Sequence, residues 1–186
     1  VRLFGGWNFS ADDAMSRDLA GVGYAKGVPM GGDLPKAGKE AKAPSFLVAA
    51  MKDAQSGNLD RIQIVKGWTD KDGKGHEKIF NVVWSDMKVR KPGKDGSIPA
   101  VGDTVDVATA TWKDTIGAPQ LTGVWSDPEF NPTQHAFYYV RVIEIPTPRW
   151  TAYDQVRFGI KMPPEVPMKH QERAWSSPIW YTPGSI

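Results

Sequence analysis

Three side chains that could recognise a ligand, Arg149, Trp150 and Tyr153, follow a long apolar stretch of the sequence. The guanidinium of Arg149 is a planar fork that can hold an anion. The indole of Trp150 can stack on a flat or sugar-like group. A structural interpretation is also open, in which Trp150 pins a loop to the fold and Arg149 forms an ion pair with Asp154. We treat Arg149, Trp150 and Tyr153 as candidate ligand-binding residues.

A second candidate site is the glycine-rich segment 27–33, GVPMGGD. Backbone N–H groups in such a segment can surround an anion. The residues that we expect to face a ligand here are Lys26, Gly31, Gly32 and Asp33. The segment lacks the GK[ST] ending of a P-loop and the GxGxxG spacing of a dinucleotide site. A connecting turn that needs positive φ at glycine would explain the same sequence without a ligand.

The remaining titratable residues do not form a recognisable catalytic or metal-binding pattern. The three histidines, His76, His135 and His170, are not at metal-ligand spacing. The acidic residues around Gly73 do not fit the calcium-binding loop of an EF-hand, and no serine lies in a G-x-S-x-G elbow. We therefore predict no catalytic residue, no metal ligand and no cofactor in this chain.

The elements that must position these residues are mainly β. Residues 136–145 carry apolar side chains on both faces of a pleat, which predicts a long central strand covered on both sides. Pro146 and Pro148 are expected to end its ladder, because proline has no N–H to donate. Residues 59–85 predict a hairpin that turns at Asp72-Gly73. Further strands are predicted at residues 1–9, 45–52, 104–112, 121–125 and 174–182, and one helix at residues 11–20.

Seven or eight strands and one short helix predict an antiparallel, Ig-like β-sandwich with long Pro- and Gly-rich loops. We place the sandwich at residues 44–186. Residues 1–43, which contain a strand, the helix and the glycine-rich loop, are expected to join it to further chain. The Lys- and Gly-rich segment 36–42 is expected to be a surface loop or hinge between the two parts.

Composition narrows the classes of partner and compartment. The net charge of +2, with acids and bases interspersed, argues against a nucleic-acid partner. No run of apolar residues approaches the length of about 20 residues that a membrane span needs. The absence of cysteine excludes disulfides and thiolate catalysis, and is compatible with a periplasmic address. Because the chain starts at Val1 within a strand pattern, we expect it to be a piece of a longer protein.

Three stretches of the sequence carry a resemblance to a known family. They are LFGGWNFSADDA with YAKGVPMGGDL, then LDRIQIVKGW with HEKIFNVVWS, and finally TWKDTIGAPQL, VWSDPEFNPTQHAFYYVRVIEIPTPRWTAYD and ERAWSSPIWYTP. Together they resemble the C-terminal portion of the bacterial domain-of-unknown-function family 3604, over nearly the whole chain. Longer members of that family resemble PHP-superfamily metal-dependent hydrolases, with a His-x-His-type metal motif upstream of this portion. That motif is not in this chain, so the resemblance implies a divalent metal only in the upstream part.

The resemblance implies that this chain is a non-catalytic accessory domain of a larger PHP-like hydrolase, with the upstream domain as its partner. It also implies a periplasmic or exported protein, and a homo-oligomer stays open. In one alternative, Lys26, Asp33, Arg149, Trp150 or Tyr153 lines the substrate cleft of that hydrolase. In another, exposed Trp and Tyr side chains make the sandwich a carbohydrate-binding module. A cleft-lining role requires the glycine-rich segment and residues 149–154 to meet on one patch, whereas a scaffold role allows them to lie at opposite ends.

Overall fold

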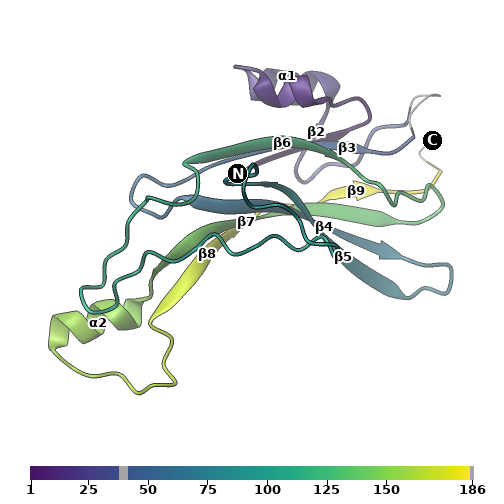
Figure 1. Cartoon of the computed structure of the whole chain (residues 1–186). Helices are drawn as coiled ribbons and strands as arrows, with labels where there is room; N and C mark the ends of the chain where they lie inside the picture. Colours follow the sequence, from purple (N-terminus) through teal and green to yellow (C-terminus); the bar gives the residue numbers. More distant parts are fainter. Residues whose placement is uncertain (38–41, 185–186) are drawn as a thin grey trace.

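The computed structural model describes residues 1–37 and 42–184 and shows two antiparallel sheets packed face to face (Figure 1). The first sheet has the order β2 (Gly27–Pro29), β1 (Arg2–Gly6), β3 (Ser45–Met51) and β6 (Gln120–Ser126). The second has the order β5 (Gly75–Trp84), β4 (Leu59–Thr69), β7 (Ala136–Pro148) and β8 (Lys169–Trp175), and β9 (Ile179–Tyr181) also pairs with β7. The helices are a 3₁₀ helix, η1 (Ala11–Met15), and two α-helices, α1 (Leu19–Lys26) and α2 (Trp150–Phe158). The predicted β-sandwich and the hairpin of β4 and β5 are thereby confirmed.

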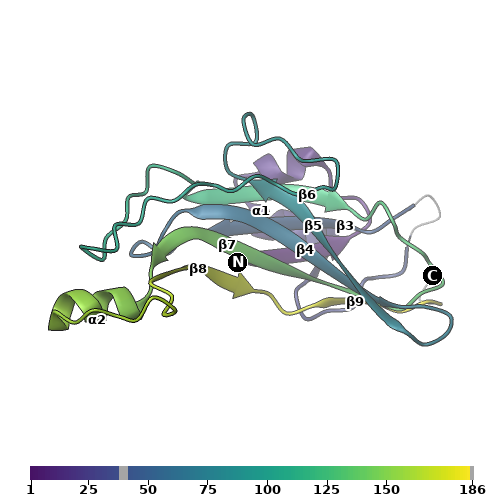
Figure 2. The same cartoon turned by 60° about the horizontal axis from the view of Figure 1, so that its bottom comes forward.

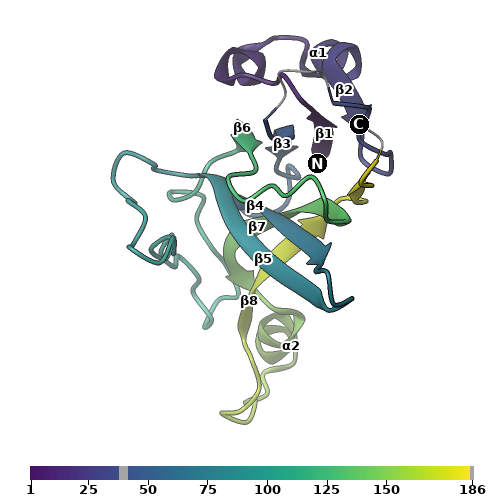
Figure 3. The same ribbon diagram turned by 90° about the vertical axis from the view of Figure 1, so that its right-hand side faces the viewer.

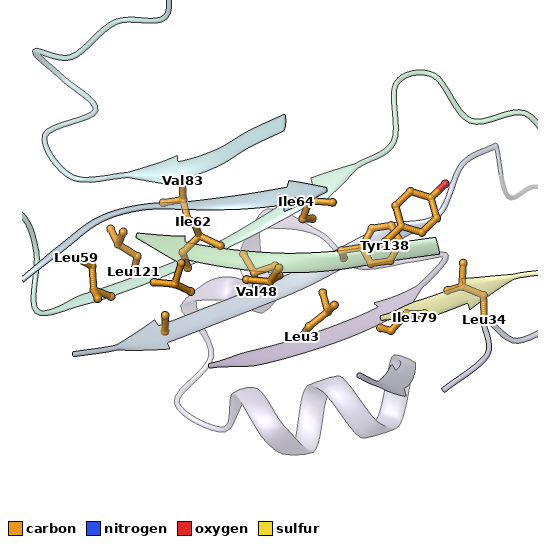
Figure 4. Close-up of a cluster of buried hydrophobic side chains, with 14 of the residues drawn as sticks. Leu3, Leu34, Val48, Leu59, Ile62, Ile64, Val83, Leu121, Tyr138 and Ile179 are labelled. Atoms are coloured by element: carbon orange, nitrogen blue, oxygen red, sulfur yellow. The ribbon is translucent and has the colours of Figure 1, made fainter. Parts of the chain in front are cut away.

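The core lies between the two sheets and follows from the alternation of side chains along each strand. In β7, Tyr138, Val140 and Val142 point into this core and are buried, whereas Phe137 and Tyr139 on the outer face are only half-buried. The aliphatic part of the core is contributed mainly by β3, β4 and β7, and Tyr138 lies at one end with its hydroxyl turned away from it (Figure 4). The core-facing side of β7 is therefore buried, as predicted for a central strand, while the outer face of β7 is only partly covered.

The outer face of the first sheet is covered by η1 and α1 (Figure 3). Phe4 and Leu47 point to this face, and Gly23 of α1 approaches so closely that a Cβ there would lie 2.4 Å from the Phe4 ring. The single helix predicted at residues 11–20 is wrong, because Asp18 starts a new helix. The Asp18 side chain accepts a hydrogen bond from the Gly21 N–H, as an N-cap does.

Strand β1 is an integral part of the first sheet. It lies between β2 and β3, with Leu3 opposite Val48 and Phe4 opposite Leu47. Strands from both sides of residue 43 therefore form one sheet. The division of the chain at that residue, and the role of residues 1–43 as a join, stay predictions. Residues 38–41 of the predicted hinge lie outside the described residues.

The strand predicted at residues 104–112 is wrong, since only an isolated bridge between Asp106 and Thr111 occurs there. Aspartate side chains accept hydrogen bonds from backbone N–H groups that would otherwise pair with a neighbouring strand. The Val105 N–H donates to the Asp103 carboxylate, and the Ala108 N–H donates to the Asp106 carboxylate. Such local bonds compete with a sheet ladder and favour turns.

Two predicted strand ends are also corrected. The ladder of β7 continues past Pro146 to Pro148, because a register irregularity between Ile143 and Pro146 accommodates residues that lack an N–H. The single strand predicted at residues 174–182 is divided into β8 and β9. Pro178 lies in the break, and the two strands pair with different parts of β7.

Candidate functional site

The glycine-rich segment forms a turn that attaches to the start of β9. Gly31 has a φ of +90°, as the turn interpretation requires. The Gly31 N–H donates to the Pro178 carbonyl (2.8 Å), and the Gly32 N–H donates to the Pro29 carbonyl (3.1 Å). Asp33 is exposed and lies in a bridge beside Trp180. Both glycine donors are therefore used within the fold, which argues against an anion cradle at these two residues.

Lys26, at the end of α1, is used in an ion pair. Its Nζ lies 2.7 Å and 2.8 Å from the two carboxylate oxygens of Asp13. This hydrogen bond, together with one from the backbone N–H of Ser10, holds the pKa of Asp13 below its ordinary value. The pair ties η1 to α1 over the outer face of the first sheet.

Replacing Lys26 with methionine is expected to raise the pKa of Asp13 towards its ordinary value. Because the folded pKa of Asp13 is lower than the unfolded one, the pair stabilises the fold above the unfolded pKa, and this contribution is lost as the pH falls through the folded pKa. An NMR titration of the Asp13 carboxyl carbon measures the shift directly. Identical titration midpoints in wild type and Lys26→Met would contradict the assignment.

The segment around Arg149 is a helix rather than the predicted loop. Arg149 is the N-cap residue of α2, and its guanidinium carbon lies 5.8 Å from the centre of the Trp150 ring. Trp150 is 61% exposed and Tyr153 is 44% exposed, so Trp150 does not pin this segment to the sandwich. In the described part of the chain, Arg149 forms no ion pair with Asp154. What anchors α2 is its buried side, where the Thr151 hydroxyl donates to the Pro167 carbonyl (2.5 Å).

The two predicted sets of site residues lie at opposite ends of the sandwich. The glycine-rich turn contacts β9, which pairs with β7 at Ala136–Tyr138, whereas α2 follows the other end of β7 (Figures 1 and 2). Arg149 lies twelve positions of extended chain after Phe137, which corresponds to about 40 Å. The sets do not form one patch, and this arrangement favours a scaffold role over a cleft lined by both.

A cavity that was not identified from the sequence lies at the β9 end of the second sheet. It has a volume of about 550 Å³, and its lining includes Trp68, His76, Glu77, His135, Phe137 and Trp180. These residues come from β4, β5, β7 and β9 and from the residue before β7. The only sequence signal was the presence of histidine and aromatic residues at the ends of the predicted hairpin and the long strand. Their convergence depends on β9 pairing with the start of β7.

One wall of this cavity is a fixed aromatic pair. The rings of Trp68 and His76 stack at 5.3 Å with an interplanar angle of 17°. His76 Nε2 lies 2.6 Å from Asp70 Oδ2, and this contact with His76 is the main reason why the pKa of Asp70 is below its ordinary value. The Lys66 ammonium lies 5.4 Å from the centre of the Trp68 ring. His76 is therefore part of a local network and not an isolated surface histidine.

The buried charged residues of the interior are paired with one another. Lys66 Nζ lies 2.6 Å from Asp127 Oδ2, and the Tyr138 hydroxyl donates to the same oxygen (2.7 Å). Burial and the Asp127 carboxylate raise the pKa of Tyr138. A second pair joins Arg90 Nη2 to Asp60 Oδ1 at 2.5 Å. These groups hold loops to the sheets, as their further bonds to backbone carbonyls show.

The sequence comparisons give one match. The model of a family described as "Protein of unknown function (DUF3604)" matches residues 1–183. The chain belongs to this family. Neither the curated proteins nor the solved structures contain a match to the sequence.

Two structural features of this DUF3604 chain bear on the predicted cofactor and membrane properties. Within residues 1–37 and 42–184, no three His, Asp or Glu side chains gather closely enough to hold a metal ion. The divalent metal that the resemblance places in an upstream part stays a prediction. In the same ranges, no helix has the length and apolar character needed to cross a bilayer.

Proposed function

We propose that this DUF3604 chain is a non-catalytic accessory domain that docks through α2 onto an upstream, PHP-like hydrolase domain of the same protein. The observation that carries the proposal is the exposure of apolar side chains on and after α2. Trp150 and Phe158 are 61% and 63% exposed, and Tyr153, Val156 and Ile160 are also exposed. Large apolar groups gathered on one projecting element are typical of an interaction surface.

The shape of the molecule supports α2 as the docking element. The helix projects beyond the end of the second sheet, with only its inner side packed on the fold (Figure 2). Only Thr151 and Ala152 of this helix are buried. An element held by so few buried residues gains stability when a second surface covers its exposed face.

The start of the chain lies towards the same end of the sandwich. Arg2 pairs with Ala49, close to the end of β3 at Met51. After a short connection, β4 begins at Leu59, which pairs with Glu144 late in β7, the strand that leads to α2. A domain preceding Val1 would therefore enter the sandwich near the end that carries α2. The resemblance of longer family members to PHP-type hydrolases supports a hydrolase domain as this partner.

Calorimetry of the longer polypeptide tests the proposal. We expect the sandwich to unfold at least about 3 °C higher there than in the 186-residue chain, which corresponds to roughly 1 kcal/mol for a domain of this size. The double variant Trp150→Ser/Phe158→Ser should remove this difference. It should leave the isolated chain unchanged, because both side chains are exposed. Equal unfolding temperatures in the longer polypeptide and the isolated chain would refute docking through α2.

A further inference from the structure

We propose that the cavity at the β9 end of the second sheet binds a neutral sugar ring, which stacks on Trp180 and hydrogen-bonds to the polar groups around it. This site is independent of docking through α2, which lies at the opposite end of β7. The exposed residues that carry the argument are Trp180, Glu77 and His135.

The aromatic side chains at the base of the cavity belong to a single row of paired residues across the second sheet. Glu77, Gly67, Phe137 and Trp180 are successive partners on β5, β4, β7 and β9, so their side-chain positions share the outer face. The missing side chain of Gly67 lets the Phe137 ring lie over the backbone, since a Cβ at that residue would come within 2.2 Å of the ring. Phe137 is thereby fixed beside Trp180, with ring centres 5.4 Å apart.

The Trp180 indole keeps a solvent-exposed face beside Phe137. The side chain of Trp180 remains 47% exposed, whereas its backbone N–H donates to the Gly32 carbonyl and its carbonyl accepts from the Leu34 N–H. The indole is therefore a large apolar face in a fixed position at the solvent boundary. The apolar C–H face of a pyranose ring stacks on such a surface and loses little conformational entropy, because both partners are rigid.

Polar groups around this face match the hydroxyls of a sugar. Within the described residues, the Glu77 side chain makes no hydrogen bond and no ion pair, so its carboxylate can accept from hydroxyl groups. His135 is exposed at the rim, and its imidazole can donate and accept. Hydroxyl groups need both donors and acceptors, and the lining supplies both next to the indole.

The same geometry disfavours an organic cation, the other ligand that aromatic side chains commonly attract. An aromatic cage needs several open ring faces directed at one point. Here the Trp68 ring is already stacked on His76 and contacted by the Lys66 ammonium. The Phe137 and Trp180 rings are tilted by 53°. A single open indole with polar neighbours fits a sugar better than a cage.

The test uses the 186-residue chain and a panel of neutral trisaccharides: cellotriose, maltotriose, xylotriose and triacetylchitotriose. Binding is measured by saturation-transfer NMR and by tryptophan fluorescence at millimolar sugar. We expect at least one sugar to bind, and Trp180→Ala to weaken that binding by about tenfold or more. The matched control is Trp175→Ala. Trp175 is similarly exposed on the same sheet but does not line the cavity, so binding should be retained.

Each outcome decides the proposal. Circular dichroism of both variants checks that they stay folded, so that a loss of binding reflects the loss of the indole. Glu77→Gln is a second variant at an exposed side chain, and it should also weaken binding. No binding of any sugar by wild type would overturn the proposal. Equal loss in Trp175→Ala and Trp180→Ala would overturn the placement in this cavity. Binding of tetramethylammonium with no response to the sugars would show that the site selects cations instead.

Discussion

Replacing Asp127 with alanine is expected to lower the free energy of unfolding by about 3–5 kcal/mol, since it leaves a buried ammonium without its counter-charge. Lys66 and Asp127 are both buried, and their charged atoms lie 2.6 Å apart. The substitution also removes the acceptor of the Tyr138 hydroxyl, and this hydrogen bond is buried. Urea denaturation followed by tryptophan fluorescence measures the change.

The control for this prediction is a nearby ion pair at the surface. Glu129 pairs with Lys78, and both side chains are about half exposed, so Glu129→Ala should cost less than about 1 kcal/mol. The Glu129 carbonyl, which accepts from Lys66 at 2.7 Å, is kept in that variant. The double variant Lys66→Met/Asp127→Ala should recover much of the lost stability, because no unpaired charge remains buried. Equal effects of Asp127→Ala and Glu129→Ala would contradict the buried-pair account.

Replacing Arg90 with methionine is expected to cost about 3 kcal/mol and to release the loop that follows β5. The Arg90 guanidinium contacts the Asp60 carboxylate at 2.5 Å and donates to the Ser85 carbonyl (3.2 Å) and the Pro99 carbonyl (2.7 Å). Methionine keeps much of the volume but makes none of these bonds. Urea denaturation gives the energetic cost, and limited proteolysis reports on cleavage within residues 86–99.

The neighbouring exposed residue Lys91 supplies the control. Lys91→Met removes a charge and introduces the same side chain one position away, where the residue is exposed. It should change stability by less than about 0.5 kcal/mol and leave the proteolysis pattern as in wild type. If Arg90→Met resembled Lys91→Met in both measurements, the buried Asp60–Arg90 pair would not be what holds this loop.

The sandwich could be predicted from the sequence because its signals are local. Alternation along residues 136–145 marks the core strand, and Asp72-Gly73 marks the turn of the β4–β5 hairpin. The strand predicted at residues 104–112 failed because Asp103 and Asp106 use their carboxylates to bond nearby backbone N–H groups. An alternating pattern does not reveal that competition.

The candidate site was harder to predict because it depends on long-range pairing. Trp180 and Phe137 become neighbours only when β9 pairs with the start of β7, and the glycine-rich turn then fixes Trp180 from its other side. The segment at Trp150 was expected to be a loop after two prolines. Instead, the ladder of β7 continues through Pro148 and Arg149 caps a helix. Sequence periodicity does not determine which strand pairs with the start of β7.

Hydrogen–deuterium exchange of the α2 amides, measured in the longer polypeptide and in the 186-residue chain, tests the central claim most directly. If α2 docks onto an upstream domain, its amides should exchange at least about tenfold more slowly in the longer polypeptide, while β4 and β7 exchange equally in both. Equal exchange of α2 in the two proteins would contradict the account of this chain as an accessory domain docked through that helix.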